Sequence, residues 1–317
     1  MDLLVEMVCC DECYQLINIC FHEVILGNIT MKKFFLFTLI SLCSCSVLAS
    51  ELNITLRQME KQIDGNIGVA VFDSQTNTSW NFNGNKRFPM MSAFKTLACA
   101  NVLYDVQQHK LSLTNKIKVT KAGLINWNPV TQNFVGGQMS LNSVCGAAML
   151  MSDNYAANLA LGQVGGPHGV TKFLRMIGDK TTRLDHFEPK LNYVEKGAEN
   201  DTTTPIAMMN TIKKLLTGKV LDSESKVQLK FWMTNNMVSD GLARAVLPTG
   251  WKIADRSGGG VNGSRTLTAM VWNKHHQPLF IGIFISNSKL ETLPELNQVV
   301  ASISAKIFNK YNIVEPH

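Results

Sequence analysis

The sequence is poor in charged residues and lacks the patterns that define several common classes of protein. Charged side chains make up 17% of its 317 residues and hydrophobic ones 45%, a balance that supports a sizeable globular core and argues against disorder. No run of Lys or Arg forms the basic stripe of a nucleic-acid-binding protein, although the net charge is +6. Repeats and low-complexity tracts are also absent, which excludes solenoid architectures.

Metal-ligand spacings and membrane-spanning runs are missing as well. The histidines show no H-x-H or H-E-x-x-H spacing, which argues against a zinc hydrolase, and we expect no metal and no cofactor beyond a water molecule. The longest apolar run is too short to span a bilayer, so we expect no membrane span. The length fits one large or two modest domains, and we expect a monomer.

Six of the eight cysteines lie in the first fifty residues, where the sequence has the parts of a secretory signal peptide. A positive segment follows Met31, an apolar stretch follows it, and Ala49 supplies a small residue for cleavage. We therefore predict a signal peptide at residues 31–50 and a location in the periplasm. Cys45 lies in a segment that also resembles a lipoprotein signal, so acylation at Cys45 stays open as an alternative.

Residues 1–30 precede this signal, whereas signal peptides begin at the N-terminus. We expect Met31 to be the physiological start and residues 1–30 to be a non-native upstream extension. A genuine extension with another role remains the alternative.

Strand patterns lie at both ends of the remaining chain, and helical patterns lie between them. Apolar, β-branched runs predict strands at residues 67–73, 79–82, 251–255, 266–273 and 279–286. Helical spacing predicts helices over residues 92–107, 140–164 with a break near 152–154, 205–216, 223–235 and from 294 onward. This order predicts an α+β fold with one antiparallel sheet built from both termini, flanked by helices and interrupted by an inserted all-α domain.

The predicted domain boundaries follow from this order. Residues 51–90 and 234–317 form the α/β domain, and residues 91–233 form the all-α domain. A cleft between the two is the default position for a site.

Two short motifs place hydroxyl groups beside a basic side chain. Ser92 and Lys95 are three residues apart, so they share one face of a helix, where a desolvated lysine can take the serine proton. Ser152–Asn154 puts three polar residues after an apolar helix, which predicts a turn that presents Ser152 and Asn154 to a cleft.

Two further motifs supply a carboxylate and cations. Glu188 and Asn192 lie four apart in a segment of poor periodicity, and together they can hold one water. Arg256 is followed by Ser257, Gly258 and Gly259, and glycines let a ligand lie against a strand edge. Arg265 is expected on the neighbouring strand as a second guanidinium for a carboxylate.

These four motifs, in this order and spacing, resemble those of the class A serine β-lactamases and the related penicillin-binding proteins. The resemblance covers residues from about 51 to about 310. It implies the serine β-lactamase/D,D-peptidase fold and hydrolysis of the β-lactam amide of penicillins through an acyl-enzyme, a reaction that confers antibiotic resistance.

The resemblance also assigns roles. It makes Ser92 the acylated nucleophile, Lys95 a candidate base for acylation and Ser152 the donor to the lactam nitrogen. Glu188 with Asn192 activates the hydrolytic water. The remaining assignments are to substrate binding: the amide of Asn154, an aromatic wall at Trp127, and an oxyanion hole from the backbone N–H groups of Ser92 and Gly259.

Two departures from the family's pattern refine this prediction. Arg256–Gly258 stands where the family usually has K-T-G, as in its carbenicillin-hydrolysing group, so we expect activity on carboxypenicillins and a selective loss of it in Arg256→Lys. His186 stands where many members have an arginine that pairs with the residue matching Asp201. The sequence leaves open whether His186 makes that pair.

Two rivals share part of the motif set. A D,D-peptidase shares Ser92, Lys95 and Ser152 but lacks the deacylating carboxylate at Glu188. A non-catalytic β-lactam sensor domain would need a membrane-spanning segment or a partner domain, and we expect no such segment after residue 50. The resemblance therefore favours the β-lactamase.

Only Cys99 and Cys145 follow the signal peptide. Related carbenicillin-hydrolysing enzymes share such a pair, which implies a disulfide between the nucleophile's helix and the helix before Ser152. Two buried thiols are the alternative.

Overall fold

The computed structural model describes residues 51–315. The predicted signal peptide, the upstream extension and Cys45 lie outside these residues. Within the described part, the residues from Thr55 onward are assigned to one compact unit. The two-domain division at residues 91 and 233 stays a prediction.

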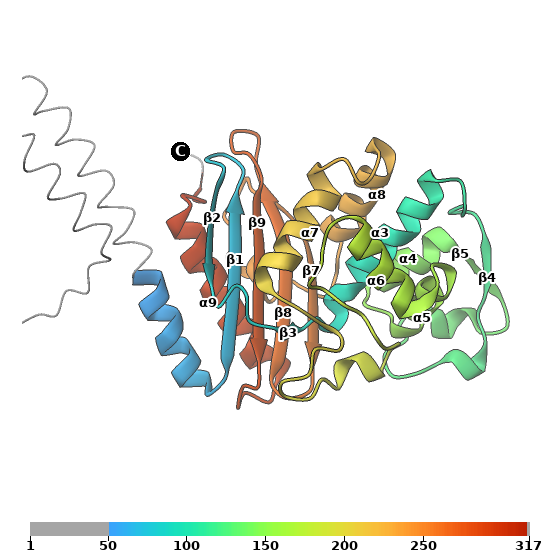
Figure 1. Ribbon diagram of the computed structural model, residues 1–317, viewed down its shortest axis with the longest axis horizontal. Coiled ribbons are helices and arrows are strands. Elements are labelled where there is room, and N and C mark those ends of the chain that lie inside the picture. Colours follow the sequence, from blue (N-terminus) through green and yellow to red (C-terminus); the bar gives the residue numbers. More distant parts are fainter. Residues whose placement is uncertain (1–50, 316–317) are drawn as a thin grey trace, which may run out of the picture. The chain divides into compact units, whose positions relative to one another are not determined.

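A five-stranded antiparallel sheet in the order β2-β1-β9-β8-β7 is the frame of the molecule (Figure 1). Two strands come from the start of the chain and three from its end, which confirms the predicted sheet. The strands are β1 (Asn66–Asp73), β2 (Thr78–Phe82), β7 (Lys252–Gly260), β8 (Ser264–Trp272) and β9 (Leu279–Ser286).

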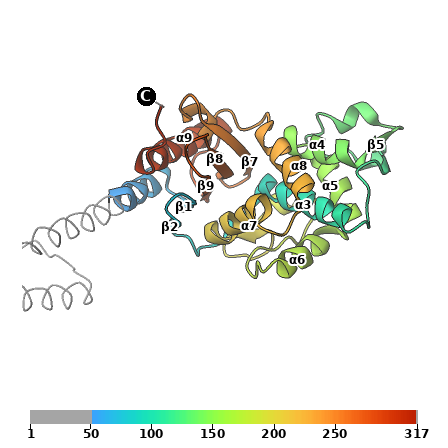
Figure 2. The same ribbon diagram turned by 90° about the horizontal axis from the view of Figure 1, so that it is seen from above.

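Helices cover both faces of this sheet. The amphipathic α9 (Leu293–Lys310) begins with a capping box of Thr292 and Glu295 and lies on one face, beside the helical residues 55–63. On the other face lies α7 (Pro205–Thr217), capped by Thr204, as Figure 2 shows from above. The sheet is therefore buried on both sides, as its β-branched strands require.

The remaining helices pack around α3 (Phe94–Gln107), whose first ten residues are all buried. Apolar residues are spread around α3 rather than confined to one stripe, so the helix is buried on all sides at the centre of the main core cluster. Its neighbours are α4 (Leu141–Leu150), α5 (Asn154–Gln163), α6 (Gly166–Met176) and α8 (Ser223–Thr234). The predicted break in the helix at 152–154 is confirmed.

Short elements connect these parts. Two-stranded pairings join β3 (Phe88–Pro89) to β6 (Thr202–Thr203) and β4 (Lys116–Lys118) to β5 (Gln138–Ser140). Single 3-10 turns are η1 (Met91–Ala93), η2 (Lys121–Gly123), η3 (Thr131–Phe134), η4 (Lys190–Asn192) and η5 (Ala243–Val246).

Two predicted elements differ from the structure in their bounds. The strand expected to end at Asp255 continues to Gly260, because Gly258–Gly260 pair with Ser264–Thr266 on β8. The helix expected from Ser92 begins at Phe94, after η1. Residues 51–63 and α6 are helical but lie outside the predicted helices. No helix in residues 51–315 combines the length and apolar character that a membrane crossing requires.

The predicted disulfide is not formed in the structure, which holds Cys99 and Cys145 as two buried thiols. Cys99 Sγ lies 3.9 Å from the carbonyl oxygen of Cys145. Burial, and then the neighbouring Cys99, raise the pKa of Cys145 well above its usual value, so this thiol resists ionisation. Both sulfurs lie between α3 and α4, where a bond would tie the two helices together.

We predict that protein exported to an oxidising compartment carries the Cys99–Cys145 bond. Denatured, unreduced protein should then show no thiol reactive to Ellman's reagent, and reduction should raise the mass by about 2 Da. The loop-entropy relation gives the bond about 4 kcal/mol of stability as an upper value. Two reactive thiols in the exported protein would contradict this prediction.

Candidate active site

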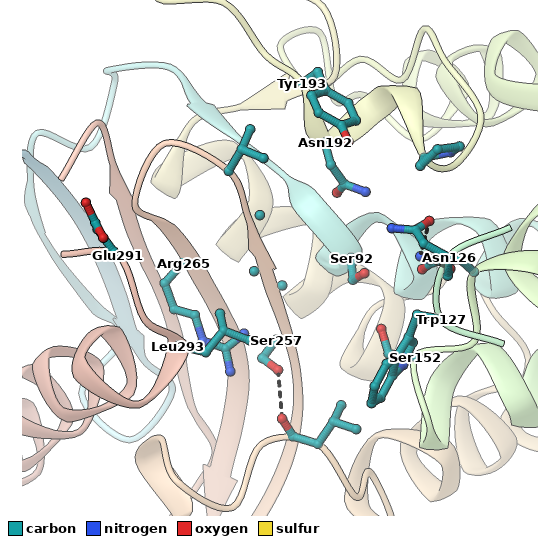
Figure 3. A pocket seen from close by; sticks show the side chains of 17 residues that line it. Ser92, Asn126, Trp127, Ser152, Asn192, Tyr193, Ser257, Arg265, Glu291 and Leu293 are labelled. Carbon is teal, nitrogen blue, oxygen red and sulfur yellow. Dashed lines mark hydrogen bonds between the residues drawn. The ribbon is translucent and has the colours of Figure 1, made fainter. Parts of the chain in front are cut away.

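A cleft of about 560 Å³ opens between the end of β7 and the helical half, and Ser92 lies at its centre (Figure 3). Arg265, Glu291 and Leu293 line the sheet side, Asn126, Trp127 and Ser152 the opposite side, and Asn192 and Tyr193 the rim between. Most of the predicted site residues are brought together here: Ser92, Trp127, Ser152, Asn154, Asn192, Ser257, Gly258, Gly259 and Arg265. The three predicted charges Lys95, Glu188 and Arg256 lie directly behind this surface.

Ser92 is presented by η1, a tight turn that precedes α3. Met91 adopts a positive φ of 48° and is buried, so the backbone turns sharply just before the serine. β7 packs against this turn so closely that a Cβ on Gly258 would lie 2.7 Å from Ser92 N. Glycine is therefore required at 258 to bring the strand beside the nucleophile.

Lys95 is fully buried one turn after Ser92. Its Nζ donates to Asn154 Oδ1 at 2.6 Å, to Ser152 O at 2.8 Å and to Ser152 Oγ at 3.1 Å. Glu188 Oε1 lies 3.3 Å from the same nitrogen. Lys95 therefore connects the Ser152 turn to the Glu188 loop through one buried cation.

The charge on Lys95 is set by opposing effects. Burial lowers the pKa of Lys95 to about 8, Glu188 raises it, and Arg256 lowers it again. At pH 7 about nine in ten lysines with this pKa carry a proton. The three hydrogen-bonded oxygens match the three donors of an ammonium group, and Glu188 adds a charge interaction.

The Ser152–Asn154 turn is held by its middle residue. Asp153 is fully buried, caps α5 by accepting from Ala156 N, and accepts from the backbone of Val130 and Thr131 at 2.9 and 2.8 Å. These bonds satisfy Asp153 within the protein and leave Ser152, with φ of 59°, pointing toward the cleft. The predicted turn is confirmed.

Glu188 lies on the irregular segment between α6 and β6, the predicted loop. Asn158 on α5 clamps its backbone through bonds to both N and O at 2.9 Å. Asn192 Nδ2 donates to Glu188 Oε2 at 2.5 Å, and Glu188 is 4% exposed. Its two carboxylate oxygens thus face Asn192 and Lys95, which fixes the carboxylate plane at the edge of the cleft.

The structure resolves the question about His186. Its Nδ1 lies 2.6 Å from Asp201 Oδ2, and Asp201 also accepts from the backbone of Asp185 and His186. Asp201 N in turn donates to Asp185 Oδ2. These bonds close the base of the loop that carries Glu188.

Arg256 requires a correction to its predicted role in binding. Its side chain is 0% exposed and contributes no surface to the cleft; Nη2 donates to Ser152 Oγ, and Nε and Nη1 have no hydrogen-bond partner in the described chain. Burial lowers the pKa of Arg256 to about 10, which leaves it charged at neutral pH. Arg256 therefore acts on the cleft through its hydrogen bond to Ser152 and through the electrostatic field of its positive charge.

Arg265 does reach the cleft. Asn297 on α9 accepts from its Nε at 2.7 Å, and this bond leaves the other guanidinium nitrogens available to a ligand. Burial lowers the pKa of Arg265 to about 10, while Asp255 opposes the shift.

Sequence reasoning missed several residues of the site. Asp153 and Asn158 position other residues, whereas Asn126, Tyr193, Val238, Glu291 and Leu293 line the cleft. Tyr193 is 63% exposed and Trp127 is 59% exposed, so two aromatic side chains stand open at the mouth. Of the missed residues, only Tyr193 could have been proposed from the sequence, because it directly follows the predicted site residue Asn192. Residues 51–315 contain no group of three His, Cys, Asp or Glu side chains placed to hold a metal.

A serine at a helix start, a buried lysine beside it and a carboxylate on a loop define a serine hydrolase of the β-lactamase fold. The chain belongs to the β-lactamase enzyme family, whose profile matches residues 51–311. It is 44% identical to β-lactamases CARB-3 and PSE-4 of Pseudomonas aeruginosa over 81% of this chain and 88% of each relative. It is a class A serine β-lactamase.

Solved structures agree with this assignment. The chromosome-encoded β-lactamase of Vibrio parahaemolyticus superposes with a TM-score of 0.81 at 47% identity and covers 82% of this chain and 98% of its own. The class A β-lactamase of the last common ancestor of Gram-negative bacteria superposes with a TM-score of 0.80 at 38% identity, over 82% of this chain and 99% of its own. The predicted family and fold are confirmed.

The opposing effects on Lys95 predict opposite shifts of its pKa in two variants. Glu188→Gln removes the charge that raises the pKa, so it should fall below about 8; Arg256→Gln removes a charge that lowers it, so it should rise. Carbon-13 NMR of labelled lysine measures both shifts, and Lys219→Gln, on the surface, is the matched control. If the pKa of Lys95 shifted in the same direction in both variants, Glu188 and Arg256 would not have the opposing effects assigned to them.

Proposed function

We propose that the protein hydrolyses penicillins, including carboxypenicillins, in the periplasm in two steps on Ser92, with water as the only co-reactant. The observation that carries this proposal is the position of Lys95, which bonds to Ser152 Oγ and lies 3.3 Å from Glu188. The groups needed to acylate the serine and to release the product are joined in one buried network. We expect the enzyme to act as a monomer.

Acylation forms an ester and opens the lactam ring. Ser92 Oγ attacks the lactam carbonyl while its proton leaves for a base, and the backbone N–H groups of Ser92 and Gly259 stabilise the oxyanion. The C–N bond then breaks, and the nitrogen takes a proton from the Ser152 hydroxyl. Lys95 Nζ replaces the proton on Ser152 Oγ and regains one from Glu188, so that Glu188 is again a carboxylate. The bond from Arg256 to Ser152 Oγ supports this role, because it directs the hydroxyl proton away from the guanidinium.

We assign the base of both steps to Glu188. Lys95 carries a proton at pH 7 with its pKa of about 8, so we assign the proton acceptor to Glu188, whose Oε1 lies 3.3 Å from Lys95 Nζ. In acylation Glu188 acts on Ser92 through a bridging water. In deacylation it takes a proton from the water that attacks the ester. The ester C–O bond then breaks, and Glu188 returns the proton to Ser92 Oγ as the product leaves. Asn192, bonded to Glu188, supplies the second polar contact for that water.

Glu188→Ala should acylate but fail to turn over. Loss of the carboxylate lowers the pKa of Lys95 further, so more of its amine becomes neutral and able to accept the proton of Ser92. No such replacement exists for deacylation. We expect a burst on nitrocefin, turnover lower by at least about 10³-fold, and an adduct seen by mass spectrometry.

Glu195→Ala is the matched control, because Glu195 lies on the same loop but is exposed. It should turn over nitrocefin normally. Steady turnover by Glu188→Ala would contradict the role of Glu188. A burst without turnover in the unmodified protein would instead favour a D,D-peptidase or a sensor.

Carboxypenicillins carry an extra carboxylate. The positive charges of Arg256 and Arg265 favour the binding of this carboxylate in the cleft. Arg256 is buried, so Arg256→Lys should lower kcat/KM for carbenicillin and benzylpenicillin by similar factors, through Ser152. This revises the selective loss expected from the sequence. Arg256→Gln, which removes the charge, should cost carbenicillin at least about threefold more than benzylpenicillin. If Arg256→Gln lowered kcat/KM equally for carbenicillin and benzylpenicillin, charge would not explain a preference for carboxypenicillins.

A further inference from the structure

A second cavity, of about 460 Å³, lies at the end of the sheet away from the cleft. It is lined by Gly250, Lys252, Trp272, Asn273, Lys274 and His275. These residues come from the start of β7, the end of β8 and the turn that leads to β9, drawn in orange at the upper end of the sheet in Figure 1. Lys252 begins β7 and Gly260 ends it beside the cleft, so the two sites are roughly 25 Å apart along the strand.

The lining of the cavity carries positive charge, and the nearby carboxylate of Glu315 is held outside it by Thr249, whose Oγ1 donates to Glu315 Oε1 at 3.2 Å. The lining has two lysines and a histidine but no carboxylate. A third lysine, Lys230 on α8, lies with Nζ 3.8 Å from the centre of the Trp272 ring. None of these lysines takes part in the ion pairs of the described chain. Burial, and then Lys252, lower the pKa of Lys230, so the cations are close enough to repel one another.

The lining is held in place by backbone structure. Lys252 and Trp272 are directly opposite each other in the β7–β8 pairing. Asn273 Oδ1 accepts from the backbone N–H groups of His275 and His276 at 2.8 and 2.7 Å, which closes the turn. Trp272 is half-buried, so part of its ring forms an apolar wall among the cations. A concave site with an aromatic wall and converging charges of one sign favours a planar ligand of opposite charge.

We propose that this cavity binds small anions that carry an aromatic ring, such as aromatic carboxylates or sulfonates. The ring of the ligand stacks against Trp272, and its anionic group lies between Lys252 and Lys274. Its volume is within the range of sites for small ligands. Binding there leaves the cleft open, since no residue is shared between the two linings.

The test is an NMR titration of the nitrogen-15-labelled protein with 2-naphthalenesulfonate. We expect saturable shifts of the Trp272 indole signal, assigned with Trp272→Phe, and of the backbone signals of residues 273–276. The neutral analogue 2-naphthalenemethanol should bind at least tenfold more weakly. The absence of saturable shifts at Trp272, or equal binding of the neutral analogue, would overturn the proposal.

Charge-reversal variants separate the cavity from general attraction to a basic protein. Lys252→Glu with Lys274→Glu should weaken binding at least tenfold and leave benzylpenicillin turnover unchanged. Lys180→Glu with Lys219→Glu changes the net charge equally at exposed positions elsewhere and should alter binding less than twofold. Equal weakening by both pairs would show that the ligand senses only net charge and would overturn the proposed site.

Discussion

The buried ammonium group of Lys95 is the constraint on which the rest of the site depends. An unpaired charge in the interior costs several kcal/mol, so the chain must bring acceptors to it. They come from separate segments: the turn before α5 supplies Ser152, the first residue of α5 supplies Asn154, and the loop before β6 supplies Glu188. Satisfying one cation therefore assembles the hydroxyl, the amide and the carboxylate that the reaction uses.

A second buried cation completes this arrangement from the sheet side. Arg256 reaches Ser152 Oγ from β7, so Ser152 lies between two cations and its hydroxyl geometry is restricted. The same strand must approach η1 closely, which only glycine at 258 permits. Asp201 and His186 close the loop that carries Glu188. The helical half, the sheet and the loop thus each position one part of a single network of hydrogen bonds and charges.

Much of this organisation could be predicted from the sequence, because it depends on patterns local in the chain. The strand and helix order, the turn at Ser152–Asn154 and the reactive residues follow from periodicity and from motif spacing. The burial of Arg256 could not be predicted, because it depends on how β7 packs against the Ser152 turn, 104 residues away. Asp153 was missed for a similar reason: its partner Thr131 lies on another segment. The redox state of Cys99 and Cys145 depends on the compartment rather than on the sequence.

In this mechanism Lys95 works as a cation while Glu188 accepts the proton. The pH dependence of kcat/KM for benzylpenicillin distinguishes a cationic Lys95 from a neutral one, because it reports the ionisable groups of the free enzyme. With the pKa of Lys95 at about 8, the active protonated form is lost as the pH rises, so kcat/KM should fall above about pH 8. A kcat/KM that instead rises through pH 8 would show that neutral Lys95 is the base and would contradict this account.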